Sequence, residues 1–173
     1  NDANCFFTTG KAMFSGKVVY RDIYEQKGIL LYFLYGLCYL VSNKTFLGVY
    51  ILEVLCLTGF LALAYDSALL FLRRRTALIL MPIAAAGLCG SYSFYYGGSV
   101  EELELALVYL PICCMLKSYF KNGDCIPSPR VIFVLGASAA CLLWSKFTLL
   151  GIYIGYVVFT AVLLIKRRDW KRL

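Results

Sequence analysis

The stretch from Val131 to Ile165 constrains the fold more than any other part of this sequence, because it is apolar throughout except for one charged residue, Lys146. A helix rises ~1.5 Å per residue, so about 20 residues cross a ~30 Å hydrocarbon core, and this stretch is too long for one crossing. Arg130 precedes it and the basic residues from Lys166 onward follow it. Cationic residues hold loops in the cytoplasm, so both ends should lie there. We therefore predict a helical hairpin that turns near the sequence WSKFTLLG, with Lys146 on the outer side.

The composition agrees with a membrane protein. Hydrophobic residues make up 61% of the 173 residues, and charged residues make up only 16%, against roughly 25% in soluble domains. The net charge of +7 comes largely from basic clusters at the ends of apolar runs. This distribution fits loops retained in the cytoplasm rather than a nucleic-acid surface, so we expect no nucleic-acid partner. The predicted class is an all-α, polytopic membrane protein.

Three further runs are apolar over about the length of a span: Phe46 to Leu72, Thr76 to Gly97, and Leu105 to Phe120. With the hairpin, they predict about five transmembrane helices. The run from Ile29 to Ser42 is shorter, and runs of this length are more often interfacial or re-entrant. We expect it to lie along the outer interface, where its Tyr and Phe side chains would reach the headgroup region.

The predicted organisation has three parts. Residues 1–45 form an external loop with a pair of amphipathic juxtamembrane helices, the first from about Ala3 to Phe14 with Gly16 as its C-terminal stop. Its apolar side is expected to contain Cys5, Phe6, Met13 and Phe14. Residues 46–165 form the transmembrane bundle, and residues 166–173 form a cytoplasmic basic segment. The absence of an initial Met and the abrupt polar start lead us to expect a fragment of a longer protein.

This topology places most of the charged residues outside the arginine-rich ends on one face of the membrane. They are Asp2, Arg21, Asp22, Glu25, Lys27, Glu101, Glu102, Glu104 and Lys146. Carboxylates can accept protons, and ammonium or guanidinium groups can stabilise a leaving phosphate. The predicted face therefore suits a site that handles a lipid-linked phosphate.

Each of these residues also has a purely structural interpretation. Asp2 can be a helix cap, and Arg21 can pair with Asp22 in a surface turn. Glu101 and Glu102 can be anions at an exposed helix N-terminus, and Lys146 can extend to the interface as a snorkelling lysine. The sequence leaves these alternatives open.

Two acidic residues lie within the predicted span from Phe46 to Leu72. Glu53 lies within a predicted span, where a charge is costly and often functional, whereas Asp66 is expected to pair with the neighbouring arginines.

Most of the eight cysteines lie in apolar runs and should behave as small hydrophobic residues. The chain has no Cys-x-x-Cys spacing and no histidine, so we predict no metal site or other cofactor; a divalent metal between Asp2 and the glutamates has no support from spacing.

Three segments resemble a known family. They are the opening stretch with its motifs GKAM, YRD and YEQKG, the segment GGSVEELEL, and the segment KFTLLGIYIG. Together they are similar to bacterial members of the C-type membrane glycosyltransferase superfamily, which includes protein O-mannosyltransferases and aminoarabinose transferases. The opening stretch resembles the first external loop of that family. Where the family often has Asp-Glu, this chain has Asp2-Ala3, and the prolines that follow the basic residue in the family are absent from KGILLYF.

The resemblance implies roles for individual residues. Asp2 would be the catalytic base or the carboxylate that orients the acceptor, and Glu101 or Glu102 would be a second acid. Lys27 would contact the lipid phosphate, with Arg21 or Lys146 as further cations. The implied partners are a polyprenyl-phosphate sugar donor and membrane lipid, and the implied location is the bacterial plasma membrane with the active site facing outside.

The leading prediction is thus an integral membrane glycosyltransferase that transfers a sugar from a polyprenyl-phosphate donor to an acceptor. Two other functions remain open. A transporter or flippase for a lipid-linked or anionic substrate would place charges at mid-membrane on discontinuous helices. A purely structural or assembly protein would leave the outer charges without convergence.

Overall fold

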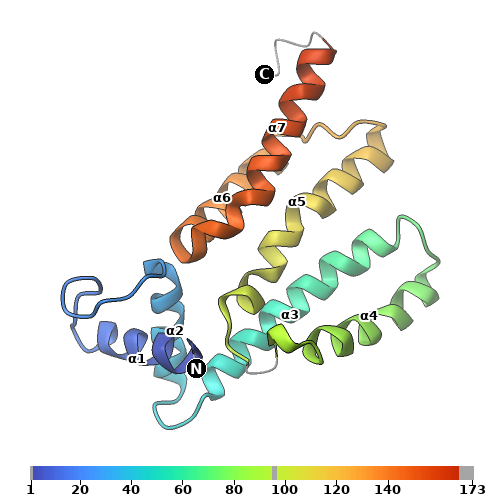
Figure 1. The fold of residues 1–173 in the computed structure, drawn as a ribbon. Coiled ribbons are helices and arrows are strands. Elements are labelled where there is room, and N and C mark those ends of the chain that lie inside the picture. The colour runs from blue at the N-terminus through green and yellow to red at the C-terminus, as the bar shows by residue number, and fades with distance from the viewer. Residues whose placement is uncertain (1, 95–96, 168–173) are drawn as a thin grey trace.

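The computed structural model describes residues 2–94 and 97–167, and its regular elements there are all helical. In chain order they are α1 (Asp2–Phe14), α2 (Ile29–Val41), α3 (Leu47–Ala68), α4 (Arg74–Cys89), η1 (Tyr92–Phe94), α5 (Val100–Asn122), α6 (Pro129–Lys146), η2 (Phe147–Leu150) and α7 (Gly151–Lys166). Figure 1 shows α1 and α2 side by side at one end of the molecule, with the longer helices diverging from that end. The all-α prediction is confirmed for the described residues.

Helices α1 and α2 pack closely because two glycines meet at their contact. A Cβ added to Gly10 would lie 2.6 Å from the backbone nitrogen of Gly36, so only glycine allows the two backbones to approach this far. Next to this contact, Phe6 packs edge-on against Tyr35 with ring centroids 5.6 Å apart. A helix lies where the first one was predicted, but its buried face differs from the prediction, because Cys5 is exposed while Phe6 is buried.

Helix α5 is the central element, and its two ends are defined by local sequence. At its start, Ser99 and Glu102 form a capping box in which each side chain accepts a hydrogen bond from the other residue's backbone N–H. At its end, Gly123 adopts a left-handed conformation, φ 67°, as is common just beyond a helix C-terminus. Helix α3 packs along α5, while α4 contacts mainly α3.

The predicted hairpin is confirmed by ion pairs at its two ends. At the turn between α6 and α7, the Lys146 ammonium contacts the Glu101 carboxylate in the first turn of α5. At the other end of α7, Arg167 Nη1 lies 2.7 Å from Asp124 Oδ2, just beyond the last turn of α5. Helices α6 and α7 therefore run in opposite directions alongside α5.

Three segments are long and apolar enough to cross a membrane: Leu47–Ala68, Val100–Lys121 and the whole Pro129–Lys166 hairpin segment. The run predicted as a span from Thr76 to Gly97 differs, because α4 ends at Cys89 and is followed by the short helix η1. Gly90 and Ser91 interrupt the helix there, although the residues beyond them remain aromatic and apolar. The first residue of the predicted external loop, Asn1, lies outside the described residues, as does 168–173 of the basic segment.

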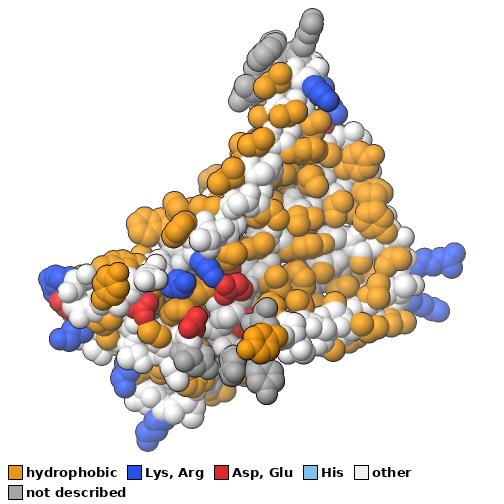
Figure 2. Space-filling view, in the orientation of Figure 1, with side chains coloured by type: hydrophobic (Ala, Val, Ile, Leu, Met, Phe, Trp, Pro, Cys, Tyr) orange, Lys and Arg blue, Asp and Glu red, His pale blue; other side chains and the backbone are white. Residues whose placement is uncertain are grey.

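The long helices expose apolar side chains over most of their length. In the isolated chain the exposed fraction is 77% for Phe133, 66% for Val157 and 64% for Ile79, and Figure 2 shows this apolar surface extending over the diverging helices, with charged side chains gathered at their ends. Exposing apolar surface of this kind to water costs about 25 cal/mol of free energy per Å². It is the surface expected of helices in contact with lipid.

Candidate functional site

Three distant segments of the chain bring four charged side chains together at the end where α1 and α2 lie. Lys146 contacts Glu101 directly, Lys27 interacts electrostatically with Glu101, and Glu104 interacts with both Glu101 and Lys146. We call these four residues the lysine–glutamate cluster. In Figure 2, basic and acidic side chains adjoin where the apolar surface ends near this junction. The structure thus brings together Lys27, Glu101 and Lys146, which were predicted as site residues.

The backbone of Lys27 is fixed by its neighbours. The Lys27 N–H donates to the Tyr32 hydroxyl at 3.0 Å, and its carbonyl accepts from the Tyr20 hydroxyl at 2.5 Å. The next N–H, that of Gly28, donates to the Ser145 carbonyl at 2.8 Å. This last bond attaches the segment that connects α1 and α2, residues 15–28, to the end of α6, one residue before Lys146. The positions of the two lysines are therefore coupled through the backbone.

Glu25 stabilises the same stretch from within. Its carboxylate accepts hydrogen bonds from the Cys5 thiol at 2.5 Å, the Gln26 N–H at 3.1 Å and the Tyr32 hydroxyl at 3.1 Å. The hydrogen bond from Cys5 is the main cause that lowers the pKa of Glu25 below its ordinary value, and the same bond raises the pKa of the Cys5 thiol. Glu25 thus joins α1, the connecting segment and α2.

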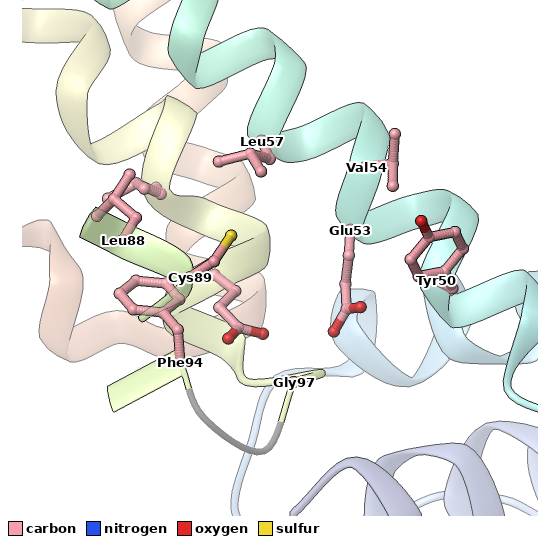
Figure 3. Close-up of a pocket in the computed structure, with 10 residues that line it drawn as sticks. Tyr50, Glu53, Val54, Leu57, Leu88, Cys89, Phe94 and Gly97 are labelled. Atoms are coloured by element: carbon pink, nitrogen blue, oxygen red, sulfur yellow. The ribbon is translucent and has the colours of Figure 1, made fainter. Parts of the chain in front are cut away.

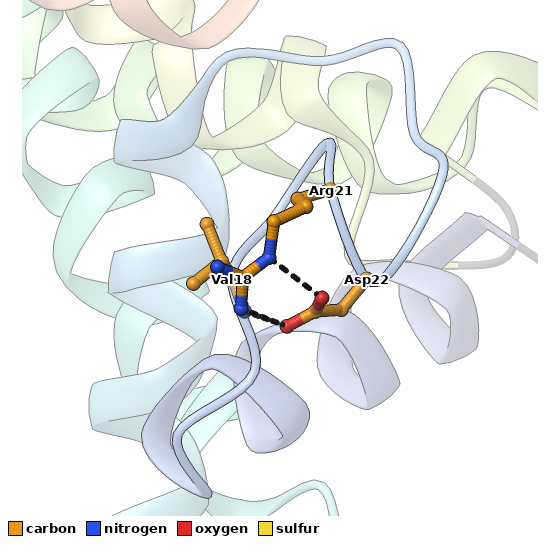
Figure 4. A network of polar contacts seen from close by, with 3 residues as sticks. All are labelled: Val18, Arg21 and Asp22. Carbon is orange, nitrogen blue, oxygen red and sulfur yellow. Dashed lines mark hydrogen bonds and ion pairs between the residues drawn. The ribbon is translucent and has the colours of Figure 1, made fainter.

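Arg21 has a different environment from the two lysines. Its Nε lies 2.9 Å from Asp22 Oδ1, and its Nη2 lies 3.1 Å from Asp22 Oδ2 (Figure 4). Asp22 also accepts a hydrogen bond from the Val18 N–H at 2.8 Å. The Arg21 guanidinium, followed by the Val18 N–H, lowers the pKa of Asp22. The surface-turn interpretation of this pair matches the observed contacts.

A second group of acidic residues lines a small cavity of about 190 Å³ beside the start of α5. Its wall includes Glu53 and Glu102 together with apolar residues such as Leu57 and Leu88 (Figure 3). The Glu53 carboxylate accepts a hydrogen bond from the Gly98 N–H, and this contact explains how a charged residue is accommodated near the start of α3. We call this cavity the carboxylate pocket.

Two consecutive glycines beside this pocket adopt backbone conformations that favour glycine. Gly97 and Gly98 both have positive φ, 64° and 67°, a conformation that other residues rarely adopt. Gly98 is also enclosed, since a Cβ there would lie 2.6 Å from the Ala3 Cβ. Its carbonyl accepts a hydrogen bond from the buried Tyr35 hydroxyl at 2.6 Å. These contacts fix the segment from which α5 begins.

Asp2 lies in the first turn of α1 and is exposed. Its neighbour Ala3 lines a cavity with Glu53 and Gly98, so this end of α1 adjoins the carboxylate-pocket side of α5. Within residues 2–94 and 97–167, no ion pair joins Asp2 to Lys27 or Lys146. Apart from Arg21, which pairs with Asp22, the predicted site residues therefore form two groups around the start of α5.

The sequence interpretation gave no role to Glu104, although a signal was present. Glu101 and Glu104 are three residues apart, so they lie on neighbouring positions of one helical face. Glu102 instead contributes its side chain to the capping box. The predicted pairing of Asp66 with the neighbouring arginines is wrong. Asp66 Oδ2 lies 2.6 Å from Lys117 Nζ, and within the described residues no ion pair joins Asp66 to an arginine.

The described residues contain no group of three or more His, Cys, Asp or Glu side chains arranged to hold a metal ion. Comparisons of the chain with protein-family models, with curated proteins and with solved structures find no match.

Proposed function

We propose that this chain is part of an integral membrane glycosyltransferase that uses a polyprenyl-phosphate-linked sugar donor. The main support is the convergence of Lys27, Glu101 and Lys146 in the lysine–glutamate cluster. These residues come from YEQKG, GGSVEELEL and KFTLLGIYIG, the three segments that carry the family resemblance. The three segments are far apart in the sequence, yet one residue of each belongs to the same cluster, as is expected of residues that share a binding site.

The proposed chemistry assigns the cations to the phosphate. Lys27 and Lys146 would stabilise the polyprenyl phosphate as it leaves with the electron pair of its bond to the sugar anomeric carbon. A carboxylate would take the proton of the acceptor hydroxyl as the new glycosidic bond forms. Glu101 is the carboxylate that contacts Lys146 and interacts with Lys27, while Asp2 and Glu102 are further candidates on the pocket side. Arg21 has no direct role in this scheme, because Asp22 already binds its guanidinium.

The ion pair between Lys146 and Glu101 is compatible with such a role. The two side chains are 22% and 48% exposed, and ion pairs with this degree of exposure contribute only about 0–1 kcal/mol. A phosphate could therefore replace Glu101 as the partner of Lys146 at small cost. Displacement would also free the Glu101 carboxylate to accept a proton.

The proposed topology places the lysine–glutamate cluster and residues 1–45 outside the bacterial plasma membrane, with about five crossings and the arginine-rich ends in the cytoplasm. Cysteine-accessibility mapping in intact cells tests it, with single reporters at Ser99, Lys146 and Arg74 on a cysteine-free background. The first two should react with an impermeant thiol reagent and the third should not. Equal labelling at Lys146 and Arg74 would contradict the proposal.

Enzyme assays test the function itself. Lys27→Gln and Lys146→Gln should each reduce sugar transfer from a polyprenyl-phosphate donor by roughly 10²-fold, as removal of one stabilising donor does in other enzymes. Lys44→Gln is the matched control, because Lys44 is an exposed lysine outside the cluster. Asp2→Asn should abolish transfer without affecting membrane insertion if Asp2 is the base. Full activity in both cluster variants would refute the proposal.

A transporter has less support. Glu53, the acidic residue that suggested one, accepts a hydrogen bond from the Gly98 N–H near the start of α3. The ion pairs that involve the long helices within residues 2–94 and 97–167 lie near helix ends. A flux assay in proteoliposomes that detects substrate movement without sugar transfer would favour this alternative. Small, scattered effects of all single charge neutralisations would favour an assembly role.

A further inference from the structure

Glu104 is the buried member of the lysine–glutamate cluster. It is only 4% exposed, and neither carboxyl oxygen has a hydrogen-bond partner among the described residues. The charged groups that interact with it are Glu101, on its own helix, and Lys146, at the end of α6. A buried carboxyl group without a hydrogen-bond partner thus lies close enough to Lys146, one of the two proposed phosphate-binding lysines, to interact with its charge.

The charge of Glu104 decides the charge of the cluster. An ionised carboxylate without hydrogen bonds is costly away from water, so the geometry accommodates the neutral acid. With Glu104 neutral, the two lysines exceed Glu101 by one positive charge. With Glu104 ionised, the cluster has no net charge and little attraction for an anion.

We propose that Glu104 is a positioning residue that keeps the lysine–glutamate cluster positive by remaining protonated, so that Lys146 can exchange Glu101 for a ligand phosphate. This inference rests on the proposed function, because it assumes that the two lysines bind a phosphate monoester. The phosphate can belong to a lipid headgroup or to a free anion. In either case, loss of the Glu104 proton weakens binding.

The experiment measures binding of farnesyl phosphate to the purified full chain in detergent, from mildly acidic to mildly alkaline pH. The wild type, Glu104→Gln and Lys146→Gln are compared at each pH, and inorganic phosphate is used as a competitor. Glutamine has the shape of the protonated acid but cannot ionise. The titration of the phosphate itself is common to the wild type and Glu104→Gln and cancels in their ratio.

We expect the wild type and Glu104→Gln to bind equally at acidic pH, and the wild type to become on the order of tenfold weaker than the variant at alkaline pH. Competition by inorganic phosphate with the same pH dependence would support a free-anion site, whereas dependence limited to farnesyl phosphate would support a lipid-headgroup site. Parallel pH profiles for the two proteins would overturn the role of Glu104. A Lys146→Gln variant that binds as well as the wild type would instead overturn the proposed function.

Should Glu104→Gln fail to fold, infrared spectroscopy of the wild type provides the test. A carboxylic-acid carbonyl band that persists at neutral pH and disappears together with the affinity supports the proposal. Absence of such a band at neutral pH refutes it.

Discussion

The attachment of residues 15–28 to α6 leads to a strong prediction for Gly28. A Cβ added to Gly28 would lie 1.8 Å from the Trp144 carbonyl oxygen and 2.1 Å from the carbonyl carbon. Both are backbone atoms, so a change of rotamer cannot relieve the clash. Ordinary contact begins at 3.4 Å, so in Gly28→Ala the stretch must move away by the difference between 3.4 and 1.8 Å, about 1.6 Å.

A displacement of this size breaks the Gly28 N–H to Ser145 hydrogen bond, now 2.8 Å long. Loss of such a bond costs about 1 kcal/mol, which corresponds to an opening about fivefold more frequent. Hydrogen exchange followed by mass spectrometry should therefore show faster exchange in peptides covering residues 17–30. Farnesyl phosphate binding should weaken in parallel, because Lys27 moves with Gly28.

Gly155→Ala is the matched control. It makes the same chemical change in α7, where a Cβ would meet nothing within 4 Å. Exchange in residues 17–30 should be unaffected in this variant. If Gly28→Ala also retained wild-type exchange, the close approach of residues 15–28 to α6 would be disproved.

The remaining predictions concern hydrogen bonds that hold the two groups of site residues in place. Tyr35→Phe leaves the Gly98 carbonyl without its buried donor and should lower thermal stability in detergent by about 1–3 kcal/mol; an unchanged melting curve would argue against this contact. Ser99→Ala removes half of the capping box and should cost about 0.5–2 kcal/mol in the same assay. Glu25→Gln removes the carboxylate that raises the pKa of the Cys5 thiol, so iodoacetamide should modify Cys5 faster at mildly alkaline pH than in the wild type. Because the pKa of Glu25 is lowered from 4.5, its contribution to stability is present above that value and is lost as the pH falls through the lowered pKa. The protection of residues 17–30, taken relative to the intrinsic exchange rate at each pH, should therefore decrease on acidification more in the wild type than in Glu25→Gln.

The sequence was most informative where hydrophobic length and charge act together. The single lysine in the long run from Val131 to Ile165 located the hairpin turn, because a charge within such a run is tolerated at an interface and not in the lipid core. The same reasoning gave the common location of Lys27, Glu101 and Lys146. The glycine stop after the first helix also agreed, since Gly16 has φ 89° just beyond α1.

Specific pairings were less predictable. The pairing of Asp66 with Lys117 depends on the rotation of α3 against α5, which hydrophobicity does not determine. The buried face of α1 is set by the Gly10 contact with Gly36, a close approach that the apolar pattern alone does not reveal. For the run from Thr76 to Gly97, hydropathy indicates how well the segment partitions into lipid. It does not indicate where the helix ends, and α4 ends at Cys89.

The hydrogen bonds around Lys27 have a kinetic consequence. They restrain its backbone from three directions, through Tyr20, Tyr32 and the bond from Gly28 to Ser145. Little conformational entropy is then left to lose on association, apart from the rotamers of the lysine side chain itself. Capture of an anion should accordingly proceed without a slow closing step, at a rate set by how quickly the anion diffuses to the site.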